Sequence, residues 1–219
     1  VNRVGSIEGV AAAAFATAFP LGGVESRLRL VGTAKGVSAP WVAGWRAVSP
    51  AYFRTLKIPL LAGRVFSGGQ RSGPVEVVIN RSLAASINSD GPPVGEVLQV
   101  VGGHAQRVIQ SDRVQIVGVV GDTARRDLLP AAPEVYVPLT ASPVHSGSLL
   151  VRLTSRGSGF SDVERAISEA NSAQPLGRDD PTRLDRAVSE ILALPRLFAG
   201  VMATTTLIVA LLALYGTWA

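Results

Sequence analysis

The side chains that could bind a metal ion are few and widely separated. The chain has no cysteine and two histidines, His104 and His145, each in a stretch rich in glycine, serine or proline. A zinc site built on this pair would need both imidazoles to meet a carboxylate, because no thiolate is available as a further ligand. Two exposed loop histidines are the simpler interpretation, so we predict no metal site.

Groups that could hold a phosphate or attack a carbonyl are no better organised. A P-loop needs a lysine between glycine and serine or threonine, and neither Lys35 nor Lys57 has these neighbours. No G-x-S-x-G nucleophile motif occurs. The loop VVGDTARRD (residues 119–127) resembles the edge of an active site, because a strand leads into glycine and then aspartate. We interpret Gly121 as a residue with positive φ and Asp122 as the cap of a following turn. We therefore predict neither a catalytic set nor a cofactor site, and any ATP that the protein uses would bind elsewhere.

The charged residues are dispersed. The formal net charge is +5, from 21 basic and 16 acidic residues, and bases often lie beside acids, as in Arg178-Asp179. This arrangement is typical of a solvated surface rather than of a nucleic-acid-binding stripe, so we predict no nucleic-acid partner.

The elements that would position these residues alternate between period-two apolar patterns and short helical patterns. We predict an α+β fold with mixed sheets and short docking helices, ending in a transmembrane α-helix. The apolar stretch near the start is too short to span a bilayer and is interpreted as a buried strand. Strands are expected at residues 10–19, 27–31, 45–48, 75–79, 97–101, 114–120, 135–137 and 149–153.

Three short helices are expected between the strands. Ser49 is the predicted N-cap of the first, and Pro59 ends it because the residue before a proline is extended. Asn80 is the predicted cap of the second helix, and Ser161 that of a third over residues 160–173.

The end of the chain has a different character. Residues 182–194 carry apolar side chains at helical spacing, which predicts an amphipathic stalk helix. Pro195 follows and would break or kink the helix. Residues 197–219 hold no charge, and 19 of them in a helix would span about 28 Å, close to the thickness of a bilayer core. A buried core helix is the alternative.

These observations divide the chain into three parts. We predict an extracytoplasmic core domain at residues 1–181, a stalk at 182–195 and a transmembrane helix at 196–219. The membrane helix has no following segment here, so we expect that the protein continues beyond the sequence.

Several stretches taken together resemble one family. They occur in the order VSPAYFRTLKIPLLAGRVF (residues 48–66), VEVVINRSLA (75–84), VQIVGVVGDTARRDL (114–128), PEVYVPL (133–139) and LPRLFAGVMATTTLIVALLALYG (194–216). They resemble the MacB-like periplasmic core domain followed by the first helix of an FtsX-like permease module, in its duplicated-orphan form.

The resemblance implies a permease subunit of an ABC transporter in the bacterial inner membrane, with its main domain on the periplasmic side. It implies a cytoplasmic ABC ATPase subunit that binds the ATP, the lipid bilayer as surroundings, and a second permease copy or a periplasmic protein as further candidate partners. No catalytic residue comes with it. Motion driven by the ATPase would pass through the stalk, for which we name the coupling residues Leu184, Val188, Ile191, Pro195 and Arg196.

Two other classes of protein remain open from the residues alone. A single-span receptor or sensor would bind a ligand in its extracytoplasmic domain and would have no further membrane helix. A membrane-anchored hydrolase would need a clustered acid, base and nucleophile, and the sequence offers no such set.

Overall fold

The computed structural model describes residues 2–18, 27–32, 40–67, 73–88, 90–101, 109, 111–123, 131–142, 147–154, 163 and 165. They belong to the first of two units into which the chain divides, Val1–Pro175, and the second unit, Leu176–Ala219, lies outside the described residues. The elements are α1 (Asn2–Gly5), β1 (Val10–Ala16), β2 (Arg27–Gly32), β3 (Trp41–Val48), α2 (Tyr52–Leu56), β4 (Leu60–Gly63), β5 (Val75–Asn80), α3 (Arg81–Ile87), β6 (Val97–Val101), β7 (Arg113–Val120), β8 (Glu134–Pro138), a 3-10 turn η1 (Leu139–Ala141) and β9 (Ser148–Leu153).

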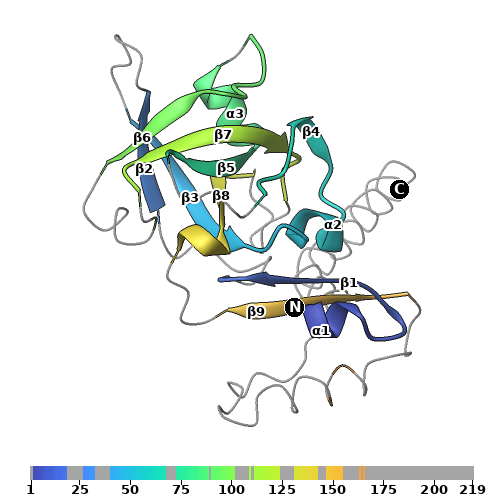
Figure 1. Cartoon of the computed structure of the whole chain (residues 1–219). Helices are drawn as coiled ribbons and strands as arrows, with labels where there is room; N and C mark the ends of the chain where they lie inside the picture. The colour runs from blue at the N-terminus through green and yellow to red at the C-terminus, as the bar shows by residue number, and fades with distance from the viewer. Residues whose placement is uncertain are drawn as a thin grey trace, which may run out of the picture. The chain divides into compact units, whose positions relative to one another are not determined.

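Six strands close into a small barrel, which is called the barrel below (Figure 1). Their order is β2-β6-β7-β5-β8-β3, and β3 pairs back onto β2, where Leu28 is opposite Ala43. The β5–β7 and β3–β8 pairs are parallel and the other four pairs are antiparallel, so the sheet is mixed. Closure gives each of the six strands two neighbours, which leaves few unpaired backbone groups on the ring.

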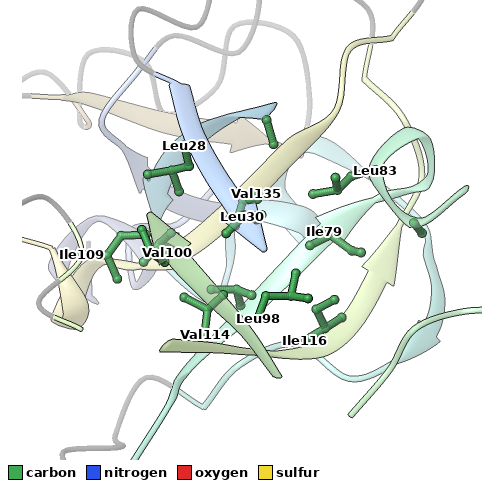
Figure 2. Packing of buried hydrophobic residues seen from close by; sticks show 14 of the residues in the cluster. Leu28, Leu30, Ile79, Leu83, Leu98, Val100, Ile109, Val114, Ile116 and Val135 are labelled. Carbon is green, nitrogen blue, oxygen red and sulfur yellow. The ribbon is translucent and has the colours of Figure 1, made fainter. Parts of the chain in front are cut away.

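Alternate residues of the barrel strands fill its interior (Figure 2). Val77 and Ile79 of β5 and Val135 and Val137 of β8 point inward, as the period of two in a strand requires. The other buried members include Leu28, Leu30, Leu98, Val100, Val114 and Ile116, with Leu83 from α3.

A second apolar layer covers the outer face of β5, β7 and β8. Here Val78 and Tyr136 point away from the interior and pack with Tyr52 and Phe53 of α2 and with Phe66. The rings of Phe53 and Tyr136 are 5.1 Å apart and nearly perpendicular, a favourable aromatic geometry. Strands β5 and β8 are therefore buried on both faces.

Strands β1 and β9 form an antiparallel pair, called the ribbon below, which lies beside the barrel in Figure 1. The pairing runs from Val10 opposite Leu153 to Ala16 opposite Ser148. The ribbon continues the sheet through one register position, Ala16 opposite Val48 of β3.

Strand β4 pairs with the C-terminal half of β7, past the residues that pair with β6, and two glycines allow this contact. Gly63 has φ of +71°, and a Cβ there would lie 2.2 Å from the carbonyl oxygen of Val117. A Cβ on Gly118 would lie 2.2 Å from the carbonyl oxygen of Arg64. Only glycine fits at either position without a backbone shift.

The predicted α+β class with a mixed sheet and short helices is confirmed, but several details of the prediction were wrong. The described strands join in one sheet rather than in several, since β3 connects the barrel to the ribbon. Strand β3 begins at Trp41, not at residue 45, because its first half pairs with β2. The short strand β4 was missed, and β1 ends at Ala16 rather than at residue 19.

Gly121 does not have the positive φ that the sequence suggested. A Cβ at this position would come within 3.0 Å of the Pro59 ring, so the need for space is what favours glycine.

In the part of the chain that the structure describes, no helix is long and apolar enough to cross a membrane. The predicted stalk at 182–195 and transmembrane helix at 196–219 lie outside the described residues. Of the helix expected over residues 160–173, Val163 and Arg165 are described and both are helical.

Candidate functional site: the joint between the barrel and the ribbon

The ribbon meets the barrel through a short set of hydrogen bonds around Ser49. The Ser49 amide donates to the Phe15 carbonyl oxygen at 2.9 Å, and the Phe15 amide donates to Ser49 Oγ at 3.0 Å. Next to them, the Thr17 amide donates to the Ala47 carbonyl oxygen and the Ala47 amide donates to Thr17 Oγ1, each at 3.0 Å. These four bonds extend the contact between β1 and β3 past the last paired strand residues.

Ser49 was therefore assigned the wrong role by the sequence. The helix α2 begins at Tyr52, its N-cap is Ala51, and no side chain caps it. The Ser49 hydroxyl instead accepts a hydrogen bond from the amide of Phe15, which lies 34 positions away along the chain.

Helix α2 contacts both the barrel and the ribbon. On the barrel side, the hydroxyl of Tyr52 accepts a hydrogen bond from Arg46 of β3 at 3.3 Å. On the ribbon side, the guanidinium of Arg152 in β9 donates to the Thr55 carbonyl oxygen near the end of α2. The helix is thus a second link between the ribbon and the barrel.

A buried ionic cluster lies beneath α2 on the outer face of the barrel. Arg46 Nε donates to Glu134 Oε1 at 2.5 Å, and the two residues are 3% and 6% exposed. The hydroxyl of Tyr136 donates to Glu134 Oε2 at 2.9 Å. The parallel register of β3 and β8 places Arg46 opposite Tyr136, with Glu134 two residues earlier on the same face.

The electrostatics of this cluster favour a fixed charge pair and neutral phenols. Burial alone would lower the pKa of Arg46, but attraction to Glu134 and the two tyrosines raises it overall. Burial raises the pKa of Tyr52 to about 12, with Arg46 opposing the shift. Burial, together with the charge of Glu134, raises the pKa of Tyr136 well above its usual value. The raised pKa values keep Arg46 charged and both phenols neutral at neutral pH, so the cluster is suited to holding the strands together.

A second polar centre ties three segments of the barrel together around Asn80. Its Oδ1 accepts from the amides of Leu83 and Glu134, at 3.0 and 2.9 Å. Its Nδ2 donates to Asp122 Oδ1 at 2.7 Å and to the Ala132 carbonyl oxygen at 2.9 Å. The predicted cap of α3 is confirmed, and the same side chain also holds the start of β8.

Asp122 binds to the start of α3, and the following turn that it was predicted to cap lies outside the described residues. Its Oδ1 accepts from Asn80 Nδ2 and from the Ser82 amide in the first turn of α3, 40 residues earlier in the chain. A carboxylate is favoured at that end of a helix, where the backbone amides have no intrahelical partner.

The residues that the sequence proposed for coupling, Leu184, Val188, Ile191, Pro195 and Arg196, lie outside the described residues, as do His104 and His145. Within the described ranges, no three histidine or acidic side chains come together in a way that could hold a metal ion. The residues that sequence reasoning missed are Arg46 and Glu134. Their signal was a single charge inside each of two apolar strands, WVAGWRAV and EVYVP, where a buried charge needs a partner.

Among the solved structures that share this fold are the following two. The periplasmic region of MacB from Actinobacillus actinomycetemcomitans is 15% identical, with a TM-score of 0.51 over 77% of this chain and 69% of that chain. The extracellular domain of the noncanonic ABC-type transporter YknZ from Gram-positive bacteria is 14% identical, with a TM-score of 0.51 over 78% of this chain and 81% of that chain. At these identities the likeness establishes the fold alone.

A search of curated proteins finds no match to the chain. The family model of the MacB-like periplasmic core domain matches residues 3–170, which include every described element from β1 to β9. The match covers well over half of the 219 residues. The chain therefore belongs to the MacB-like periplasmic core domain family.

Proposed function

We propose that the chain is the extracytoplasmic domain of an ABC-transporter permease, and that it carries the motion of a separate cytoplasmic ATPase to the outer side of the membrane. Membership of the MacB-like family supports this function. So do the fold neighbours, a MacB periplasmic region and the extracellular domain of an ABC-type transporter. In this proposal the chain performs no bond chemistry, and ATP binds to the partner subunit.

The observation that carries the proposal is the pairing of the first and last strands of the described body. Val10 at the start of β1 lies opposite Leu153 at the end of β9, and the Thr154 amide donates to the Gly9 carbonyl oxygen at 2.9 Å. The chain segments before β1 and after β9 thus connect to the same end of the ribbon. A displacement applied to either connection reaches the ribbon first.

From the ribbon, two routes lead to the barrel. One is the set of hydrogen bonds between Phe15 and Ser49, and the other is the Arg152 contact with α2. Beneath α2, the Arg46–Glu134 pair joins β3 to β8, so a displacement of the helix is passed on to two barrel strands. Packed cores respond to such displacements as units because they are dense and weakly compressible.

The segment after the described body completes the proposed path. The apolar face of Leu184, Val188 and Ile191 would pack the stalk helix, and Pro195 with Arg196 would set the stiffness of its joint with the membrane helix. A lipid bilayer surrounds residues 196–219 in this proposal, with the main domain on the periplasmic side of a bacterial inner membrane.

The test uses the complete permease, reconstituted in proteoliposomes with its ATPase. We expect Pro195→Ala to lower the coupled ATPase rate about fivefold or more, the low end of typical coupling energies between distant sites. Pro92→Ala is the matched control, because Pro92 is exposed in a barrel loop and should leave the rate unchanged.

A second variant tests the path through the described body. Arg152→Met removes the hydrogen bond from the ribbon to α2, and it should lower the coupled rate while the domain still unfolds cooperatively. If both Pro195→Ala and Arg152→Met fold normally and retain the wild-type coupled rate, the proposed transmission is wrong.

A further inference from the structure

Two leucines of β4 are exposed side by side. Leu60 and Leu61 are 45% and 44% exposed, and six of the eight residues in 57–64 lie at the surface. In a regular strand, neighbouring side chains point to opposite faces, so one of two leucines would normally be covered. The register between β4 and β7 shifts between Leu60 and Ala62, which marks a bulge at this point.

The strand that carries these leucines also has an open edge. It pairs with β7 on one side, and among the described residues no strand pairs with it on the other. Figure 1 shows β4 at the margin of the barrel, directly after α2. An open strand edge presents unpaired backbone groups, which an added strand can satisfy.

The stretch of sequence that contains this edge carries charge of one sign. Residues 26–75 contain eight basic residues and no acidic one, whereas the rest of the chain holds 13 basic and 16 acidic residues. Arg54 and Lys57 precede β4 and Arg64 follows it, and all three are exposed. Arg64 is paired with Glu76 at 2.5 Å, so Arg54 and Lys57 are the cations beside β4 that a partner's carboxylates would meet first. The basic stretch is not evident from the overall composition, because acids elsewhere offset it.

We propose that the open edge of β4 is a docking surface for an extended, acidic segment of a partner protein. The segment would add a strand beside β4, place its apolar side chains on Leu60 and Leu61, and place its carboxylates near Arg54 and Lys57. A lipid surface would leave the open backbone groups of β4 without hydrogen-bond partners. A second copy of β4 would bring like charges opposite each other, which destabilises strand pairing.

The test is a titration of the full chain in detergent micelles with a fluorescein-labelled peptide of alternating valine and glutamate, followed by anisotropy. The matched peptide has lysine in place of glutamate, and a third has the acidic sequence with alternate backbone nitrogens methylated. We expect the lysine peptide to bind at least about tenfold more weakly than the acidic peptide, because repulsion across an interface costs several kcal/mol. Methylation should weaken binding because it removes the strand-pairing donors, and added salt should weaken it through screening.

Variants of the chain locate the surface. Leu61→Gln should weaken binding of the acidic peptide, and Val42→Gln, at a residue of β3 that is 46% exposed, should not. Lys57→Glu should weaken binding of the acidic peptide and strengthen that of the lysine peptide. Arg113→Glu, on the exposed start of β7, is its charge-matched control.

Three results would overturn the proposal. The first is equal binding of the acidic and lysine peptides, or no binding of either. The second is an equal effect of Leu61→Gln and Val42→Gln. The third is that Leu61→Gln alters only association with anionic phosphatidylglycerol nanodiscs, or only self-association in sedimentation velocity, which would identify lipid or a second copy as the occupant. No ATPase is present in these measurements, so the outcome is independent of the proposed transport function.

Discussion

Arg46 and Glu134 are 88 positions apart in the chain, and their side chains meet at 2.5 Å beneath helix α2. The contact exists because β3 and β8 are parallel neighbours in the barrel. Ion pairs of this kind are sensitive to the loss of one partner, since the remaining charge stays buried.

Removing one charge of this pair should be more damaging than removing both. We expect Glu134→Gln to lower the free energy of unfolding by about 3–5 kcal/mol, the usual cost of leaving a buried charge unpaired. The double variant Arg46→Met/Glu134→Gln should recover at least about 1.5 kcal/mol of that loss, within the range measured for contacting residues. Urea titration followed by tryptophan fluorescence measures both, and a double variant no more stable than Glu134→Gln would contradict the expectation.

Asn80 should be the most sensitive amide side chain in the described body. Asn80→Ala removes the cap of α3 and leaves the Glu134 amide and the Ala132 carbonyl oxygen without their partner. We expect a loss of about 3 kcal/mol or more, from a helix cap of about 1 kcal/mol and a buried unsatisfied group of 1–3 kcal/mol. Asn88→Ala, at the exposed end of the same helix, should change stability by less than about 0.5 kcal/mol in the same urea titration.

Gly63 should not tolerate a side chain. Gly63→Ala combines a positive φ with a clash against the Val117 carbonyl oxygen, and we expect it to cost more than about 2 kcal/mol. Two controls separate these causes. Gly95→Ala has a positive φ and open space, so it should cost less, and Gly91→Ala has neither problem and should be close to neutral. Thermal unfolding of the three variants should rank them in this order, and similar midpoints would exclude the clash.

Glu76 should contribute to the loss of stability in acid. Its hydrogen bonds with Arg64, which oppose the effect of burial, lower its pKa below the ordinary 4.5. A lowered folded-state pKa stabilises the fold above the unfolded-state pKa, and this contribution is lost as the pH falls through the folded value. Glu76→Gln should therefore flatten the decline of unfolding free energy below about pH 5. Arg64→Gln should flatten the decline of unfolding free energy over the same pH interval. A decline identical to that of the wild type in both variants would contradict this account.

The sequence predicted the strands best where both faces are buried. Four of the five residues 75–79 are apolar, and the exception is Glu76. Both faces need apolar side chains, since Val77 and Ile79 fill the barrel while Val78 packs in the layer that contains α2. The Asn80 cap was also predictable, because its bond to the Leu83 amide spans three residues. Strand β4 was missed since its leucines carry no alternating pattern, and that absence reflects a bulged edge strand.

By itself, the sequence determined the α+β class, most of the strands and the capping of α3, because these depend on spacing along the chain. The tertiary structure alone decided that β2 and β3 pair to close the barrel and that Arg46 pairs with Glu134. It also decided that the Ser49 hydroxyl binds the Phe15 amide and does not cap α2. Each of these depends on which distant strands become neighbours. Local propensity carries little information on that choice, because it is made by the packing of whole strands around a shared core.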